Sequence, residues 1–282
     1  MKTRPLSFLS AASFLVLVSA AASTACSSAP TADLSDENVA TTSAALSTSL
    51  GTSGIASLSS SDPAAAASAA AADKDGDECR TRSVDPAQPN VVHVVLNDCS
   101  GRFGRHHVSG NMTITFSLNA DGSLHAEHQS DSLTMDGRPA THDASADITF
   151  DGDVRHVNWH GVWTHTKLDG ETAEHTADHV IEVNRATHCR TVNGTGVTHV
   201  GARQIDSTIT DFTTCEGTGD IDACPTGKIE HDNVAKGRTM TETFDGSDVA
   251  SVQIIKPKGE TSKAVTLNCG PSSEPSASTT AP

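Results

Sequence analysis

The chain contains no tyrosine, two tryptophans and seven phenylalanines among 282 residues. Two of the phenylalanines, Phe8 and Phe14, lie in an N-terminal segment that we expect to be removed on export. Aromatic side chains normally supply much of the apolar surface that a core buries. A body this poor in them needs other constraints, and disulfides are the ones that the sequence offers.

Basic residues and long apolar runs are scarce as well. Lys and Arg number 19 against 35 Asp and Glu, so the formal net charge is −16 at pH 7. No basic stripe exists to neutralise phosphates, and we therefore expect no nucleic-acid partner. After the N-terminal segment, no run approaches the roughly 18 apolar residues of a transmembrane helix, so none is predicted.

Cysteine, in contrast, occurs in an informative pattern. There are seven, and Cys26 stands apart from the rest, directly after the short apolar segment. An odd count in an exported protein leaves one thiol to explain. If Cys26 carries a lipid, the remainder suffices for three disulfides. The other six cysteines are Cys79, Cys99, Cys189, Cys215, Cys224 and Cys269.

Residues 1–25 are predicted to be a signal peptide. Lys2 and Arg4 give it a positive start, and Phe8–Ala22 is apolar but too short to remain as a spanning helix. Cleavage at the small residues Ala20–Ala22 is the alternative to lipoprotein processing. In either case we expect the protein to be exported.

The residues around Cys26 resemble the lipobox of bacterial lipoproteins. Ala25 is small, as the pattern requires, whereas Ser23 stands where an aliphatic residue is usual. The resemblance implies a palmitate-type acyl anchor on Cys26, and several acyl chains hold a protein stably on a membrane. Ser27, in place of Asp, implies passage to the outer membrane, on its periplasmic or cell-surface face.

Composition divides the rest of the chain into three regions. Residues 26–78 are predicted to be a disordered tether rich in Ala, Ser and Thr, 79–270 a β-domain, and 271–282 a disordered tail. The tether has no aromatic residue, so we expect it to bury too little apolar surface to offset chain entropy. Within it, Asp62–Ala72 is interpreted as low complexity.

Asp-Gly pairs, strong signals for a β-hairpin turn, punctuate the body. Between the turns apolar and polar residues alternate, as in 111–118 and 143–150, which is typical of half-buried strands. We predict an all-β fold of about ten to twelve long antiparallel strands in meander order, closed or curved like a barrel, with a sandwich as the alternative. We expect a monomer. The turn pairs begin at Asp121, Asp136, Asp151, Asp169, Asn193 and Asp245.

The six body cysteines are predicted to be structural. Cys215 and Cys224 are separated by eight residues that include two glycines, so we pair them across a loop. The other four allow three connectivities, which the sequence leaves open. Our preference is Cys79 with Cys99 and Cys189 with Cys269.

Fourteen histidines offer candidate metal ligands. His156 and His160 share one face of their predicted strand, while His175 and His179 share parity with Ile181 and are expected to face inward. Imidazoles on adjacent strands lie about 5 Å apart and can meet around Zn²⁺ or Cu²⁺. We nevertheless expect most histidines to be polar strand residues that face solvent.

The run His175–His179 looks like a zinc-peptidase H-x-x-E-H motif with Asp178 in place of Glu. That motif requires a helix, so that both histidines reach one ion. The surroundings fit a strand, on which residues four apart are separated by about 13 Å. We therefore do not predict a peptidase.

Short motifs centred on Cys and Gly occur at 97–101, 107–110, 189–196, 213–227 and 265–269. They resemble a group of uncharacterised secreted lipoproteins recurrent in myxobacterial-type genomes. The resemblance implies an exported β-rich domain with structural cysteines, and it carries no activity.

These observations favour an envelope-anchored lipoprotein whose β-domain serves a binding or structural surface role rather than a catalytic one. Its expected partners are the membrane, through the lipid, and an envelope or extracellular ligand held by loops between strands. One alternative is a zinc- or copper-binding lipoprotein that uses the strand histidines, and otherwise no cofactor is expected. A second alternative is a hydrolase whose site the sequence does not reveal.

Overall fold

The structure is a computed structural model, and it describes residues 58–72, 79–100, 107–167, 169–215, 223–267 and 269. The predicted signal peptide, its neighbour Cys26 and the tail 271–282 lie outside the described residues, so these predictions stay predictions. Within the described part, no helix is long and apolar enough to cross a membrane.

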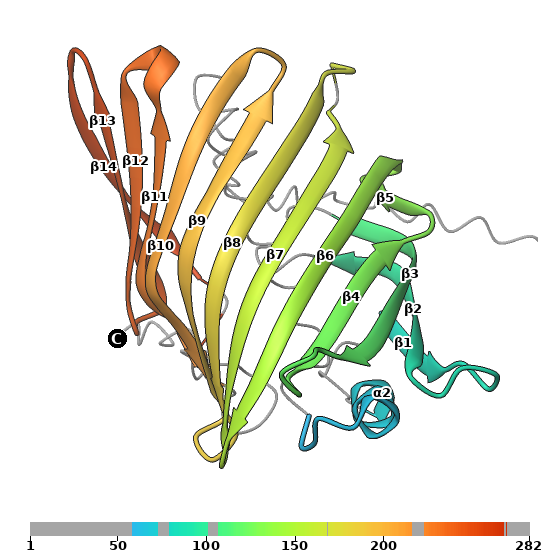
Figure 1. Cartoon of the computed structure of the whole chain (residues 1–282). Helices are drawn as coiled ribbons and strands as arrows, with labels where there is room; N and C mark the ends of the chain where they lie inside the picture. The colour runs from blue at the N-terminus through green and yellow to red at the C-terminus, as the bar shows by residue number, and fades with distance from the viewer. Residues whose placement is uncertain are drawn as a thin grey trace, which may run out of the picture.

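The described strands form one antiparallel sheet of 14 strands. They follow one another across the sheet in chain order, from β1 at one end to β14 at the other, and Figure 1 shows them side by side in a single twisted and curved sheet. The predicted all-β antiparallel meander is confirmed. The strands outnumber the expected ten to twelve, and they form one curved layer in place of a sandwich.

The strands are long, and most pair along their full length with both neighbours. Their bounds are β1 Arg80–Val84, β2 Val91–Ser100, β3 His107–Leu118, β4 Leu124–Ser130, β5 Leu133–Met135, β6 Arg138–Asp151, β7 Val154–Thr166, β8 Thr172–Asn184, β9 Cys189–Val200, β10 Arg203–Cys215, β11 Thr226–Asn233, β12 Arg238–Asp245, β13 Val249–Lys256 and β14 Gly259–Thr266, with a helix α2 at Pro63–Ala72 and a 3₁₀ turn η2 at Val234–Lys236.

β4 and β5 are two parts of one strand that runs between β3 and β6. Both parts pair with both of these neighbours. Asp131 and Ser132 interrupt the strand as a bulge, which shifts the register by one residue. Gly110 of β3 lies against this bulge with φ +128°, and a Cβ atom there would overlap the carbonyl of Ser132. The close approach of the two backbones therefore requires glycine.

All five Asp-Gly pairs lie at hairpin turns, as predicted, and their glycines adopt φ between 56° and 88°. The Asn193-Gly194 prediction is wrong, because this pair lies inside β9. There the side-chain oxygen of Asn193 accepts a hydrogen bond from the backbone N–H of Asp211, 2.7 Å away, at a bulge in β10. A Cβ atom on Gly194 would overlap the carbonyl of Asp178 in β8. Here Asn-Gly fits a bulge into the sheet and forms no turn.

Alternation along each strand gives the sheet two different faces. We call the inner face the one that carries the buried side chains, such as Trp159 and Trp163 of β7. We call the outer face the one that carries exposed residues, such as His160. On the inner face, alanines of β6 lie beside these tryptophans, and Gly161 leaves room for the ring of Trp159. Small residues thus accommodate the few aromatic side chains.

Helix α2 packs against β1, β2 and β3 and is part of the fold (Figure 1). Ala66, Ala67 and Ala70 are at most 1% exposed and belong to the core. The prediction that this segment is disordered tether is wrong. Asp62 caps the helix by accepting a hydrogen bond from the N–H of Ala65 at 2.7 Å, Pro63 begins it, and alanine has the highest helix propensity.

Arg155 of β7 holds the chain that leads into α2. Its side chain is buried, and its Nε donates a hydrogen bond to the carbonyl of Leu58 at 2.8 Å. The guanidinium also donates to the carbonyls of Gly152 and Val154, and it lies 4.9 Å from the ring centroid of Phe150. A buried cation is thereby satisfied by backbone oxygens and an aromatic face.

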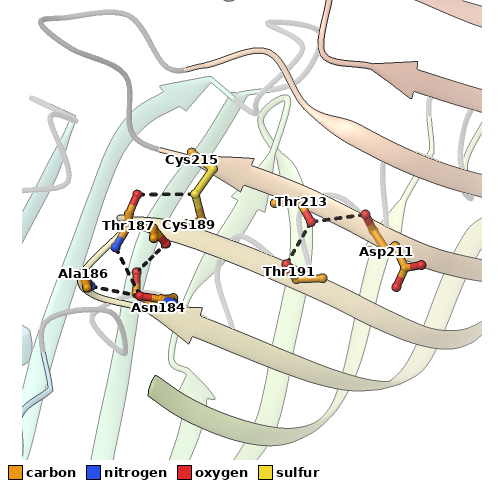
Figure 2. The surroundings of a disulfide bond; sticks show 8 residues. All are labelled: Asn184, Ala186, Thr187, Cys189, Thr191, Asp211, Thr213 and Cys215. Carbon is orange, nitrogen blue, oxygen red and sulfur yellow. Dashed lines mark hydrogen bonds between the residues drawn. A yellow bond between two sulfur atoms is a disulfide. The ribbon is translucent and has the colours of Figure 1, made fainter. Parts of the chain in front are cut away.

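Three disulfides join the described cysteines, and the predicted Cys79–Cys99 pair is confirmed. The predicted Cys215–Cys224 and Cys189–Cys269 pairs are wrong. Cys189 and Cys215 lie directly opposite each other in the register of β9 and β10, with Cα atoms 4.0 Å apart (Figure 2). The remaining bridge joins Cys224, before β11, to Cys269, after β14, and ties the last four strands together.

The tight connection between β8 and β9 presents Cys189 to its partner. The side-chain oxygen of Asn184 accepts hydrogen bonds from the N–H groups of Ala186 and Thr187, at 3.0 and 3.2 Å (Figure 2). Next to the disulfide along β9 and β10, the hydroxyls of Thr191 and Thr213 are hydrogen-bonded at 2.8 Å. These contacts fix the register in which the disulfide forms.

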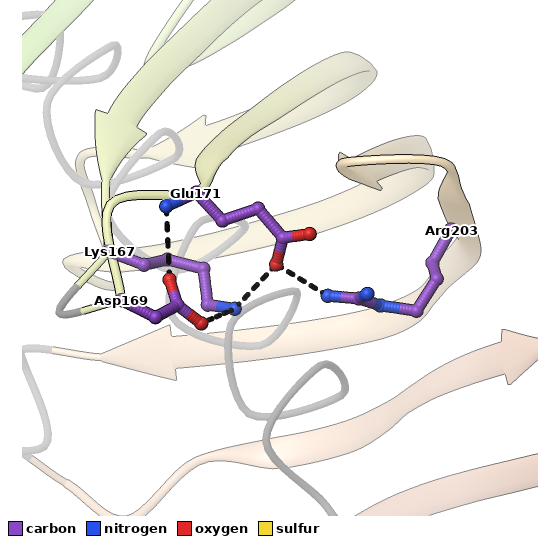
Figure 3. A network of polar contacts seen from close by, with 4 residues as sticks. All are labelled: Lys167, Asp169, Glu171 and Arg203. Atoms are coloured by element: carbon purple, nitrogen blue, oxygen red, sulfur yellow. Dashed lines mark hydrogen bonds and ion pairs between the residues drawn. The ribbon is translucent and has the colours of Figure 1, made fainter.

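An ion-pair network holds the turn between β7 and β8 against the start of β10 (Figure 3). One oxygen of Glu171 contacts Lys167 Nζ at 3.0 Å and Arg203 at 2.6 Å, and Lys167 also reaches Asp169 at 3.1 Å. Hydrogen bonds from Lys167 and Arg203 lower the pKa of the Glu171 carboxyl. The network joins two turns that are not adjacent in sequence.

Candidate functional site

The outer face carries hydroxyl, imidazole and carboxylate groups in repeated rows that cross three strands. Such a row forms because directly opposed residues of an antiparallel sheet point to the same face. Each row places Ser or Thr, then His, then Asp or Glu on successive strands. The rows are Ser117–His125–Asp147 across β3, β4 and β6, and Ser145–His160–Asp178 and Thr149–His156–Glu182 across β6, β7 and β8.

In each row the imidazole interacts with the carboxylate through Nδ1. The Nδ1 to oxygen distance is 2.7 Å for His125 and Asp147 and 2.8 Å for His160 and Asp178. For His156 and Glu182 it is 3.8 Å. Hydrogen bonds from His125 and from Asn119 lower the pKa of Asp147. A neutral imidazole that donates from Nδ1 presents its lone pair at Nε2.

These rows have the residue types of a Ser-His-Asp triad but lack its geometry. Ser145 makes no hydrogen bond to His160, and a nucleophile and its base require that contact. The side chains of His160 and Asp178 are 54% and 75% exposed, so they stand in water on an open face. The arrangement is suited to contact with a partner surface.

The four predicted metal ligands are divided between the two faces of the sheet. His156 and His160 lie on the outer face, each beside a carboxylate. His175 and His179 face inward as predicted, where His175 Nδ1 contacts the hydroxyl of Thr198 at 2.8 Å. The structure does not bring the four together. Across the described ranges, no group of three or more His, Cys, Asp or Glu residues is placed to hold a metal ion.

Four more histidines lie buried on the inner face, where the sequence did not lead us to expect them. They are at most 5% exposed, and desolvation lowers the pKa of His128 and of His231 to about 4 and that of His142 to about 3. Their parity is the signal that was available, since His128 follows Leu124 and Ala126 at two-residue steps. The four are His128, His142, His165 and His231.

A shallow surface depression lies elsewhere, at the last hairpins of the sheet. Ser247 and Ser251 line it together with Asp245 and Lys263. The depression is open, and none of the residues that line it belongs to the rows.

Comparison with protein-family models, with curated proteins and with solved structures gives no match to this chain. The three disulfides are typical of a protein that folds outside the cytoplasm.

Proposed function

We propose that this protein is an exported, lipid-anchored envelope protein, and that its β-domain acts without catalysis by binding a cationic partner through the outer face. The observation that carries the proposal is the set of three rows described above. Their carboxylates are more than half exposed and lie on β6 and β8, on the two sides of β7, on one face of the sheet. A net charge of −16 adds a long-range attraction for cationic groups.

The anchor rests on the sequence around Cys26 and on the disulfides, which are expected in an exported protein. The lipid keeps an anchored domain at the membrane, where its effective concentration near other envelope components is high. Weak contacts through an open binding face are then sufficient. A flat polar face binds an extended partner over many weak contacts, whereas an enzyme needs a cleft that excludes water. The proposal therefore assigns recognition to the sheet and retention to the lipid.

The test uses unlipidated Cys26→Ser protein and cell envelopes isolated from the source bacterium. Sedimentation with the envelopes is expected at low ionic strength and is expected to weaken as salt screens the contact. Replacing Asp147 and Asp178 by Lys should abolish co-sedimentation, whereas Glu260→Lys, at the far edge of the sheet, should leave it unchanged. Equal binding by all three proteins would overturn the role of the outer face.

Anchoring is tested separately in cells. Wild-type protein should fractionate with membranes and carry an acyl adduct, and Cys26→Ser should be released into the soluble fraction. Membrane fractionation that does not depend on Cys26 would refute the lipid anchor while leaving the binding result intact.

A further inference from the structure

His128 and His142 form a buried pair on the inner face, on strands β4 and β6. Their side chains are 1% and 0% exposed. The ring centroids lie 6.4 Å apart, and the ring planes are inclined by 82°. The two residues are diagonal neighbours, because His128 lies opposite Ala144 and His142 is the next residue of β6 on that face. Two imidazoles are therefore directed into one apolar region of the core.

Neither imidazole has a hydrogen-bond partner at either of its ring nitrogens. A buried polar group without a partner costs about 1–3 kcal/mol, so native proteins rarely leave one unexplained. Here four such nitrogens occur within one pair of side chains. Other buried histidines of this sheet do have side-chain partners: His231 Nδ1 contacts the hydroxyl of Ser207 at 2.8 Å, and His175 Nδ1 contacts that of Thr198 at 2.8 Å.

A methionine completes the group. Met112 of β3 lies opposite Ser130 of β4, and the backbone N–H of His142 donates a hydrogen bond to the Ser130 hydroxyl at 2.8 Å. His128 precedes Ser130 by two residues, so it points to the same face. Met112 and His142 thus lie on either side of Ser130. His128 is a diagonal neighbour of each, and diagonal neighbours about 7–8 Å apart are within reach of long side chains.

We propose that Met112, His128 and His142 bind one Cu⁺ ion inside the sheet. A thioether selects a soft cation, and imidazole is a common ligand of copper. A Zn²⁺ site would need four ligands, and a second positive charge would be uncompensated in this apolar region. No Asp or Glu is among the buried residues of the described part of the chain, so a monovalent ion is the cation that the pair can accept.

The protonation state supports the same assignment. Burial lowers the pKa of His128 to about 4, and burial with the nearby His128 lowers that of His142 to about 3. Both rings are therefore neutral at pH 7, which is the form that binds a metal. Neither has to lose a proton before it can bind.

The two tryptophans of the chain border the pair on its β7 side. The ring of His142 is stacked on Trp159 at 6.4 Å and lies 5.8 Å from Trp163. These rings exclude water from the ligands. They also make tryptophan fluorescence a local reporter, because the chain has no other tryptophan. Since the ligands are buried, release of the ion requires an opening of the structure, and we expect it to be slow.

The experiment titrates full-length mature protein with Cu⁺, kept reduced by ascorbate under nitrogen, against a chromophoric Cu⁺ chelator. All proteins carry Cys26→Ser, so that the unlipidated chain has no free Cys26 thiol to compete for Cu⁺. We expect one tightly bound Cu⁺ per chain, with quenching of tryptophan fluorescence. Met112→Leu keeps the packing and removes the sulfur, and it should weaken binding about tenfold. His142→Phe should abolish binding.

Matched controls separate this site from the other ligands of the chain. Met240→Leu removes a buried thioether from a different cluster, and His199→Phe removes an exposed imidazole of β9 that lies outside the rows, so both should bind Cu⁺ as the parent does. X-ray absorption at the copper edge should show nitrogen and sulfur neighbours. Equal affinity of the Met112→Leu and parent proteins, a signal without sulfur, or binding without fluorescence quenching would each overturn the proposal.

Discussion

His179 stacks on Trp159 on the inner face, with ring centroids 5.0 Å apart and ring planes inclined by 20°. The contact uses a histidine as a flat, neutral core side chain. Other histidines are buried on the inner face in the same way, at positions where an aromatic or aliphatic residue is normally expected. A chain with so few aromatic residues thus builds part of its core from imidazoles, and the stability of that core depends on their charge.

Stability is expected to fall in acid because of these histidines. Burial lowers the pKa of His175 to about 3 and those of His179 and His231 to about 4, from 6.5. Between pH 6.5 and about 4 the unfolded chain binds protons that the folded chain does not, so the free energy of unfolding decreases as pH falls. Above pH 6.5 both states are neutral at these residues, and they add no pH dependence. Urea unfolding at pH 7.5, 6 and 5, with disulfides intact, measures the effect.

A variant isolates one of these groups. His179→Phe keeps a ring on Trp159 and removes a titrating group. Between pH 6 and 5 its free energy of unfolding should therefore fall by about 1.4 kcal/mol less per pH unit than that of the wild type. His199→Phe, on the outer face, is the control and should follow the wild type. If the free energy of unfolding of the wild type does not change between pH 7.5 and 5, the pKa values of the buried histidines are not lowered as described.

Gly161 is expected to control the position of Trp159. A Cβ atom on Gly161 would overlap the indole ring, so Gly161→Val must displace it. Overpacking of this kind costs about 1–3 kcal/mol, and the tryptophan emission should shift to the red as the ring becomes hydrated. Thr195→Val, on the outer face of β9, should change neither property. An unshifted emission in Gly161→Val would show that the ring lies elsewhere.

Helix α2 is expected to be required for the stability of the sheet. Ala67→Asp places an unpaired carboxylate in the core and should lower the free energy of unfolding by more than about 2 kcal/mol. The adjacent Ser68 is exposed, so Ser68→Asp should change stability by less than about 0.5 kcal/mol. Chemical denaturation compares the two. If both variants unfold like the wild type, α2 does not pack on the core.

The disulfide between Cys189 and Cys215 is open to a direct chemical test. Cleavage at Glu216, Asp220 or Asp222 separates Cys215 from Cys224, so non-reducing peptide mapping distinguishes the two pairings. We expect a peptide pair that joins Cys189 to Cys215. Replacing both by Ser should cost about 2–4 kcal/mol of stability. A peptide that links Cys215 to Cys224 would contradict the structure.

Local signals predicted the strands well, because turn chemistry and two-residue alternation are properties of neighbouring residues. Each Asp-Gly turn has a positive φ at its glycine, and in one of them Asp136 has a positive φ as well. Asn193-Gly194 has the same chemistry but lies in a strand, since its role depends on Asp211 of β10 and Asp178 of β8. The role of such a pair cannot be predicted from its own two residues, because it depends on the neighbouring strands.

The wrong disulfides have a similar cause. Loop length favoured Cys215 with Cys224, whereas the register of β9 and β10 places Cys189 directly opposite Cys215. The alanine-rich segment looked disordered because its stability comes from docking on the sheet, which composition does not report. The outer-face rows were beyond prediction for the same reason, since they require three strands in register.

We propose above all that an oxidised β-domain is anchored to the envelope through Cys26. Intact-mass measurement of native protein extracted from membranes, before and after reduction, tests it most directly. The account predicts a chain that begins at Cys26 with an acyl adduct, and a gain of two hydrogens for each of the three disulfides on reduction. An unacylated chain that begins at another residue, or a mass that reduction leaves unchanged, would contradict it.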